Sequence, residues 1–157
     1  MKYRVCLALA VAVADQLIKA LVRRLPMGVV LWEIPGVFSV VHCVNTGAAF
    51  SMMAGYTAAL TILSAVLLGV VFFAAKRLRM TAPAWTAIAC LIGGGVGNLL
   101  DRLLQSGVTD YICLSFIDFP VFNLADMAIT GSIAVLLILL FTDRLEEPAE
   151  EKHGSDD

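Results

Sequence analysis

Two aspartates near the end of the chain are the residues best placed to do chemistry. Asp126 lies three residues before a long apolar run, Ile129 to Phe141, and Asp110 lies in the motif Val108-Thr109-Asp110-Tyr111. An ionised side chain is costly beside hydrocarbon, so a carboxylate at the start of such a run indicates a functional site that includes a partner residue. The segment between them, residues 112–121, is long enough to double back and bring the two carboxylates together.

A close pair of carboxylates can hydrolyse an amide bond. The two groups cannot both ionise readily, so one keeps its proton while the other acts as a base, and the pair titrates as a unit. Such a pair can activate a water molecule for attack and then protonate the leaving nitrogen. The sequence shows no H-E-x-x-H motif and no serine or cysteine with a convincing base. Aspartyl hydrolysis is therefore the hydrolytic mechanism that these residues support.

Other interpretations of these charges stay open. Asp126 follows Asn123 by three positions, which is the spacing of a helix-capping pair with no catalytic role. Asp15, Lys19, Asp101 and Asp126 could instead form the relay of a small proton-coupled transporter. A third possibility is an accessory membrane subunit that only packs against other chains.

The composition indicates an integral membrane protein. The chain has 157 residues, of which 60% are hydrophobic, and its mean hydropathy is +0.89. A formal net charge of -2 gives no basic face for nucleic acid. The four cysteines show neither zinc-ligand spacing nor a disulfide framework, and no metal or organic cofactor is expected.

The pattern predicts an all-α integral membrane domain over residues 1–142. The four expected spans cover about 5–22, 57–75, 84–104 and 123–142, each near the length needed to cross a bilayer. The long first loop, 23–56, contains the β-branched stretch Val37 to Val44 and is predicted to form one or two strands outside the hydrocarbon. Residues 143–157 form an acidic tail that is expected to be disordered.

The positive charges predict the orientation of the spans. With four spans, seven basic residues fall on one side and four on the other, which places both termini in the cytoplasm. Asp15, Asn45 and Asp101 then gather with the two candidate carboxylates near the extracytoplasmic end. This convergence of five separate stretches predicts a site there.

Two further patterns concern the polar residues within the spans. Asp15 and Lys19 are four residues apart and can form an ion pair on one helical face, as a structural pair or as part of the site. Asp101 and Arg102 could likewise be a structural pair at a helix end. Gly93 and Gly97 form a small-xxx-small face for close helix packing, within one chain or between two.

Five motifs, taken together, resemble those of the lipoprotein signal peptidases, the signal peptidase II family, over about residues 10–140. They are Asp15-Gln16-Leu-Ile-Lys19, Asn45-Thr-Gly47-Ala-Ala-Phe50-Ser51, Gly94-Gly-Val-Gly97-Asn98-Leu-Leu-Asp101-Arg102, Val108-Thr-Asp110-Tyr111 and Phe122-Asn123-Leu-Ala125-Asp126. The resemblance implies an aspartyl endopeptidase of the bacterial inner membrane, with four transmembrane helices and a small extracytoplasmic β-cradle from the first loop. Its substrates would be diacylglyceryl-modified prolipoproteins, cut before the lipidated cysteine.

The resemblance also implies roles for single residues. Asp110 and Asp126 match the catalytic dyad, and the remaining matched positions would shape the site or hold the substrate: Asp15, Lys19, Asn45, Gly47, Asn98, Asp101, Arg102 and Asn123. The expected partners are the prolipoprotein and membrane lipid, with no metal, no cofactor and a monomeric chain. Thr109 and Tyr111 depart from the family, which more often has Val and Phe there. Asp118 is expected to have only a surface role.

Overall fold

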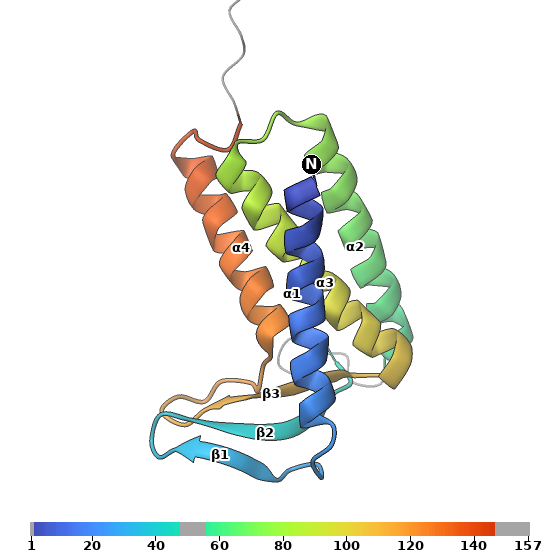
Figure 1. Cartoon of the computed structure of the whole chain (residues 1–157), viewed down its shortest axis with the longest axis vertical. Helices are drawn as coiled ribbons and strands as arrows, with labels where there is room; N and C mark the ends of the chain where they lie inside the picture. The colour runs from blue at the N-terminus through green and yellow to red at the C-terminus, as the bar shows by residue number, and fades with distance from the viewer. Residues whose placement is uncertain (1, 48–55, 147–157) are drawn as a thin grey trace, which may run out of the picture.

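The computed structural model describes residues 2–47 and 56–146, which form four long helices and a small sheet (Figure 1). The helices are α1 (Lys2–Val22), α2 (Thr57–Arg77), α3 (Ala82–Gln105) and α4 (Leu124–Phe141). All four are long and apolar enough to cross a membrane. The predicted fold of four transmembrane helices with a small sheet is therefore confirmed. Residues 48–55 of the first loop and 147–157 of the acidic tail lie outside the described residues.

α3 is the central helix of the bundle. Nine of its residues are buried, against two each in α2 and α4, and it packs against all three other helices. α2 and α4 expose large apolar side chains such as Phe73 and Leu137, as expected for helices that face lipid. Four polar residues of α1 and α3 are buried inside the bundle: Asp15, Lys19, Asn98 and Asp101.

Glycines allow α3 to lie close to its neighbours. A Cβ atom added to Gly93 would lie 2.5 Å from the backbone oxygen of Ala8 in α1, and one added to Gly94 would lie 2.6 Å from that of Ala125 in α4. A Cβ at Gly97 would lie 2.5 Å from the Asp15 carboxylate. The predicted small-residue face at Gly93 and Gly97 therefore packs within the chain, against α1.

Gly93→Ala is expected to destabilise the fold, because the added methyl group would meet rigid backbone. Overpacking of this kind costs about 1–3 kcal/mol of unfolding free energy, which corresponds to a fall of roughly 2–4 °C in Tm per kcal/mol for a chain of this size. Thermal unfolding in one detergent measures the shift. Gly69→Ala in α2 is the matched control, because a Cβ there has no neighbour within 4 Å. Equal Tm values for the two variants would contradict the packing argument.

The sheet lies at one end of the helix bundle (Figure 1). Its strands β1 (Val30–Ile34), β2 (Phe38–Asn45) and β3 (Val108–Leu114) are antiparallel and adjacent in that order. The first loop supplies β1 and β2, and β3, which follows α3, adds a third strand that the sequence did not predict. Cys43 of β2 pairs with Asp110 of β3, so one candidate carboxylate lies on this added strand.

The chain doubles back after β3, as the sequence predicted. Ile112 and Phe122 exchange two backbone hydrogen bonds, of 2.8 and 3.0 Å, and α4 begins directly afterwards. At the other end of the bundle, the first residues of the predicted disordered tail are ordered. The segment 143–146 crosses to the turn between α2 and α3, where the Thr81 amide donates to the Leu145 oxygen at 3.1 Å.

Candidate active site

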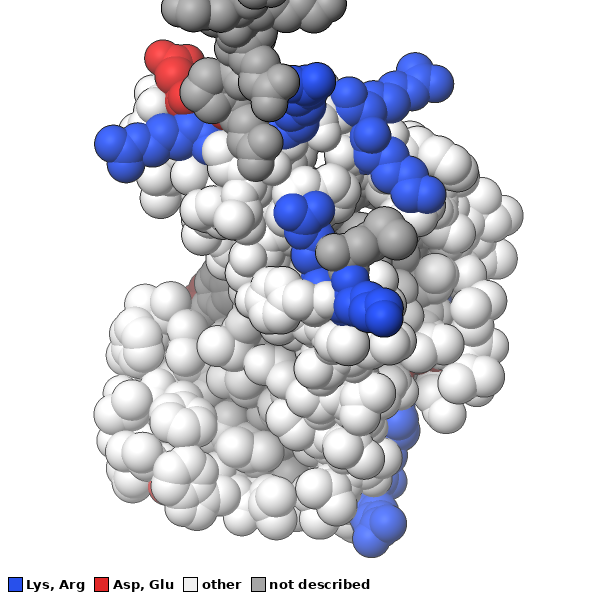
Figure 2. Space-filling view, turned by 45° about the horizontal axis from the view of Figure 1, so that its top comes forward, with Lys and Arg blue, Asp and Glu red and all other residues white. Residues whose placement is uncertain are grey.

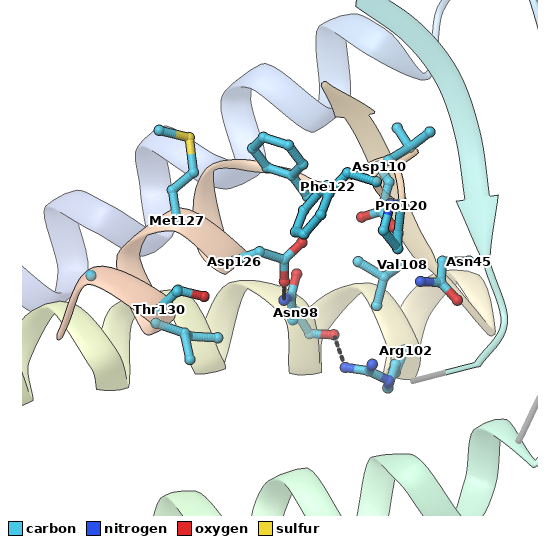
Figure 3. A pocket seen from close by; sticks show the side chains of 14 residues that line it. Asn45, Asn98, Arg102, Val108, Asp110, Pro120, Phe122, Asp126, Met127 and Thr130 are labelled. Carbon is cyan, nitrogen blue, oxygen red and sulfur yellow. Dashed lines mark hydrogen bonds between the residues drawn. The ribbon is translucent and has the colours of Figure 1, made fainter. Parts of the chain in front are cut away.

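Asp110 and Asp126 line one cavity of about 550 Å³ at the junction of the helices and the sheet (Figure 3). Asp110 comes from β3 and is 3% exposed, and Asp126 comes from the first turn of α4. The structure therefore brings the two predicted carboxylates to the same place. Asn98 and Arg102 of α3, with Asn45 of β2, line the same cavity.

Asn123 connects the two carboxylates and is itself fully buried. Its side-chain nitrogen donates to Asp110 Oδ1 at 2.6 Å, and its backbone amide donates to Asp126 Oδ2 at 3.1 Å. Its side-chain oxygen accepts from the Asp126 amide at 2.9 Å. The capping arrangement that competed with catalysis as an explanation of Asp126 is thus present, and the same residues hold both carboxylates in position.

The carboxyl group of Asp110 holds a proton unusually well. Burial, together with the nearby charge of Asp126, raises its pKa to about 7. Hydrogen bonds from Asn123 and Asn45 and the charge of Lys19 act in the opposite direction. Near neutral pH the pair can therefore hold one proton and one negative charge, which is the state that aspartyl hydrolysis needs.

Lys19 lies at the centre of a buried charge network behind the two carboxylates. Its ammonium is 2.8 Å from Asp15 Oδ2 and 3.3 Å from Asp101 Oδ2, and it donates to Asn98 Oδ1 at 2.7 Å. Asn98 in turn donates to Asp126 Oδ1 at 2.7 Å. The predicted pair of Asp15 and Lys19 is therefore formed, and one amide side chain separates it from the site.

Asp15 and Asp101 also hold the backbone beside each candidate carboxylate. Asp15 Oδ1 accepts from the amide of Ala125 at 3.1 Å, and Asp101 Oδ2 accepts from the amide of Thr109 at 2.8 Å. Ala125 precedes Asp126 and Thr109 precedes Asp110 in the sequence. Each buried aspartate therefore holds the backbone directly before one of the two candidate carboxylates.

Two residues of this network were not predicted as site residues. Arg23 Nη1 lies 3.0 Å from Asp101 Oδ1, and Gln16 Nε2 donates to the same oxygen at 2.9 Å. Gln16 belongs to the first motif, so the motif could have identified it as a site residue. For Arg23 the sequence offered no indication beyond its position at the end of a predicted span. With Arg23 the network holds two cations and two carboxylates and so balances its charge.

Arg102 points into the cavity and does not pair with Asp101. Among the described residues, Asp101 forms its ion pairs with Lys19 and Arg23. Within residues 2–47 and 56–146, the Arg102 guanidinium donates to the Gly47 oxygen at 3.4 Å and to the Asn98 oxygen at 3.5 Å. A guanidinium has five N–H donors, so Arg102 is a candidate to bind a ligand in this cavity.

The two departures from the family motif each make a polar contact. Thr109 Oγ1 accepts from Arg23 at 3.3 Å, and the Tyr111 hydroxyl accepts from the amide of Leu124 in the first turn of α4 at 3.1 Å. Burial raises the pKa of Tyr111 to about 12, so the hydroxyl stays neutral. Asp118, by contrast, is exposed and does not line the cavity, which supports the surface role expected for it.

The rest of the cavity wall is largely apolar. Its side chains come from the segment that precedes α4 and from α4 itself, and they include Phe119, Val121, Phe122, Met127 and Ile129. No cluster of three or more histidines, cysteines, aspartates or glutamates that could hold a metal occurs within residues 2–47 and 56–146. A cavity with apolar walls and a protonatable pair at one end suits a ligand that carries both an amide and hydrocarbon.

Comparisons with known proteins point to one family. A family model described as signal peptidase (SPase) II matches residues 7–142. Proteins named lipoprotein signal peptidase are similar to this chain. That of Dehalococcoides mccartyi is 37% identical over 145 residues, which cover 88% of this chain and 89% of the relative. That of Streptococcus thermophilus is 33% identical over 137 residues, which cover 86% of this chain and 90% of the relative. A solved bacterial membrane enzyme is 25% identical, covers 96% of both chains and has a TM-score of 0.86.

Proposed function

This chain belongs to the signal peptidase II family of aspartic peptidases, and on that premise we propose that Asp110 and Asp126 are its catalytic pair. The protein is a multi-pass membrane enzyme with lipoprotein signal peptidase activity, so its substrates are prolipoproteins. The observation that carries the assignment of the pair is Asn123, which joins both carboxylates in one buried arrangement at the end of the cavity. Membership of this family of peptidases replaces the two alternative hypotheses, a proton-coupled transporter and a packing subunit.

The two carboxylates are proposed to have different roles. Asp126, whose two oxygens accept from Asn98 and from the Asn123 amide, takes a proton from the attacking water. Asp110 holds the proton and gives it to the carbonyl oxygen as the water oxygen bonds to the carbonyl carbon. The proton gained by Asp126 then passes to the leaving nitrogen as the C–N bond breaks, while one hydroxyl proton of the intermediate returns to Asp110 and leaves a carboxylic acid product. Each role belongs to the coupled pair and not to an independent residue.

The other residues of the cavity are proposed to hold the substrate. Arg102 can donate to peptide carbonyls, and Asn45 can donate to the oxygen on which negative charge develops. The apolar wall would accommodate the hydrocarbon near the cut, so that the diacylglyceryl group stays in a lipid-like environment while the amide meets the pair. We place the scissile bond directly before the lipidated cysteine.

The orientation proposed for the protein puts both termini in the cytoplasm of a bacterium. The end of the bundle opposite the sheet carries most of the basic residues (Figure 2), which agrees with the preference of positive charge for the cytoplasmic side. The catalytic pair would then lie at the extracytoplasmic face of the inner membrane. Compartment-specific labelling of a cysteine introduced after Lys152 would reveal the side on which the C-terminus lies.

Cleavage of a purified diacylglyceryl-modified prolipoprotein tests the proposed substrate and cut. The wild-type enzyme should release the signal peptide and give a faster-migrating band, and mass spectrometry of the product should show the lipidated cysteine as its first residue. The same precursor without the lipid is the control and should remain uncut. A product that begins at another residue would refute the proposed position of the cut.

The pH dependence of cleavage should reflect the proton on Asp110. Because its pKa is raised to about 7, the fraction of enzyme with the proton in place falls as the pH rises above neutral. The cleavage rate at low substrate concentration should therefore fall on the alkaline side, approaching about tenfold per pH unit for a single required proton. Initial rates across the pH range in which the protein stays folded measure this. A rate that stays level well above neutral pH would contradict the role of Asp110 as the acid.

A further inference from the structure

A second cavity lies at the opposite end of the bundle from the catalytic pair. It has a volume of about 270 Å³ and lies where α2 and α4 flank α3. Ala75 from the end of α2, Ile88 from α3 and Leu137 from α4 line it, with Met80 and Leu145 at the turn and the segment that follow the helices. All its lining residues are apolar, so the space suits a hydrocarbon chain.

The segment after α4 closes the outer end of this cavity. The Thr81 hydroxyl donates to the Arg144 oxygen at 2.9 Å, and its amide donates to the Leu145 oxygen. These bonds hold two stretches that are more than sixty residues apart in sequence. They place Leu145 in the cavity wall and fix Arg144 beside it, so the end of the cavity is a built feature of the fold.

Two arginines are adjacent in sequence to residues that line the closed end. Arg79 directly precedes Met80 and Arg144 directly precedes Leu145, and both of these apolar neighbours line the cavity. Within the described part of the chain, neither guanidinium forms an ion pair or a side-chain hydrogen bond. Figure 2 shows several lysine and arginine side chains in the upper part of the view, and others at its lower edge. The described acidic residues nearby, Asp143 and Glu146, are fewer than the basic ones.

We propose that this cavity binds an acyl chain of an anionic phospholipid whose phosphate is held by Arg79 and Arg144. A guanidinium group suits a phosphate because it can donate two parallel hydrogen bonds to the phosphate oxygens. Basic pockets between transmembrane helices on the cytoplasmic side recognise anionic headgroups in this way. The apolar part of a signal peptide is the rival occupant, but such a peptide carries a basic N-terminal region, which the same arginines would repel.

Photo-crosslinking with labelled lipids tests the site without using activity. Purified full-length protein would be placed in phosphatidylcholine vesicles that contain a trace of phosphatidylglycerol with a photoactivatable group in its acyl chain. A phosphatidylcholine probe with the same chain serves as the reference. Mass spectrometry should find the phosphatidylglycerol adducts enriched over the reference on the peptides that contain residues 71–80 and 133–145. Equal labelling by the two lipids would overturn the proposal.

Two variants separate the headgroup from the chain. Arg79→Gln with Arg144→Gln should reduce the preference for phosphatidylglycerol by about fivefold per arginine, whereas Lys2→Gln with Arg77→Gln removes equal charge at the same membrane end and should have little effect. Ala74→Trp fills the cavity and should abolish adducts on these peptides, unlike Ala65→Trp on the exposed surface of the same helix. Equal effects of the two charge variants would reduce the finding to general surface charge and overturn the site. Adducts that persist in Ala74→Trp would overturn the proposed occupant. Slower prolipoprotein cleavage by Ala74→Trp, with an unchanged preference for phosphatidylglycerol, would overturn it as well.

Discussion

Asp110→Asn and Asp126→Asn should each reduce prolipoprotein cleavage by about a thousandfold or more, because either change removes one of the two proton-transfer groups. Asparagine has nearly the same shape as aspartate. At position 110 its oxygen can still accept from Asn123. At position 126 it can still accept from Asn98 but gives up the hydrogen bond from the Asn123 amide. The loss of cleavage should therefore be mainly chemical, with a small structural cost at position 126. A gel-shift assay on lipidated precursor, run to long times for the variants, measures it.

Asp118→Asn is the matched control for these variants. It makes the same chemical change on the segment that connects β3 to α4. Its side chain is exposed and does not line the cavity, so cleavage should remain near the wild-type rate. If Asp118→Asn lost as much activity as Asp110→Asn, the assignment of Asp110 rather than Asp118 to the pair would be contradicted. Near wild-type activity in either dyad variant would remove that residue from the pair.

Thermal unfolding checks that the dyad variants fold and gives a second signature for Asp110. Its pKa in the folded protein is raised to about 7 from 3.8, so its contribution to stability is complete below the lower value and is lost as the pH rises through the upper one. The asparagine of the Asp110→Asn variant has no such titration. As the pH rises from about 4 to about 7, the Tm of this variant should therefore increase relative to that of the wild type, and the difference should level off above 7. A difference that stays constant across this range would contradict the raised pKa.

Lys19→Met should be among the most destabilising single substitutions in the chain. The ammonium is fully buried between Asp15 and Asp101, and its removal leaves two buried carboxylates with only Arg23 to balance them. Breaking a buried ion pair by removing one partner costs about 3–5 kcal/mol of unfolding free energy. Cleavage should also fall, since Asn98 loses the contact that orients it toward Asp126. Denaturation in detergent and the cleavage assay measure the two effects.

A second substitution tests the electrostatic cause. Asp15→Asn restores charge balance in the Lys19→Met background while keeping an oxygen to accept from the Ala125 amide. The double variant should therefore recover part of the lost stability, which a double-mutant cycle would report as a favourable coupling energy. Arg24→Met serves as the control, because this side chain is exposed and should tolerate the change. If the double variant were simply the sum of the two single losses, the network would not act as a unit.

Local spacing in the sequence predicted the parts of the site that lie on one helix. Asp15 and Lys19 are four residues apart, and the helix places them together whatever surrounds it. Asn123 and Asp126 have the spacing of a capping pair and form one. The same spacing had supported a structural and a catalytic interpretation of Asp126, and the geometry is compatible with both because the cap is what fixes the carboxylate.

The remaining parts depend on contacts between distant segments, which no local pattern reveals. Arg23 reaches Asp101 across a separation of 78 residues, and β3 becomes a strand because β2 supplies its partner. Adjacent residues on a helix point about 100° apart, since a turn contains 3.6 residues. Asp101 can therefore face the interior of the bundle while Arg102 faces the cavity, although their adjacency in sequence had suggested a pair.

The links from Asp15 to Ala125 and from Asp101 to Thr109 bear on how the enzyme is made. α1 is synthesised first, and its ion pair between Asp15 and Lys19 neutralises both charges within one helix, which lowers the cost of inserting that helix alone. The backbone beside Asp126 is fixed only when α4 packs against α1 and the Ala125 amide donates its hydrogen bond to Asp15. A chain that is still emerging from the ribosome therefore holds no assembled pair. Proteolytic competence would therefore appear only after the last helix has packed against the others.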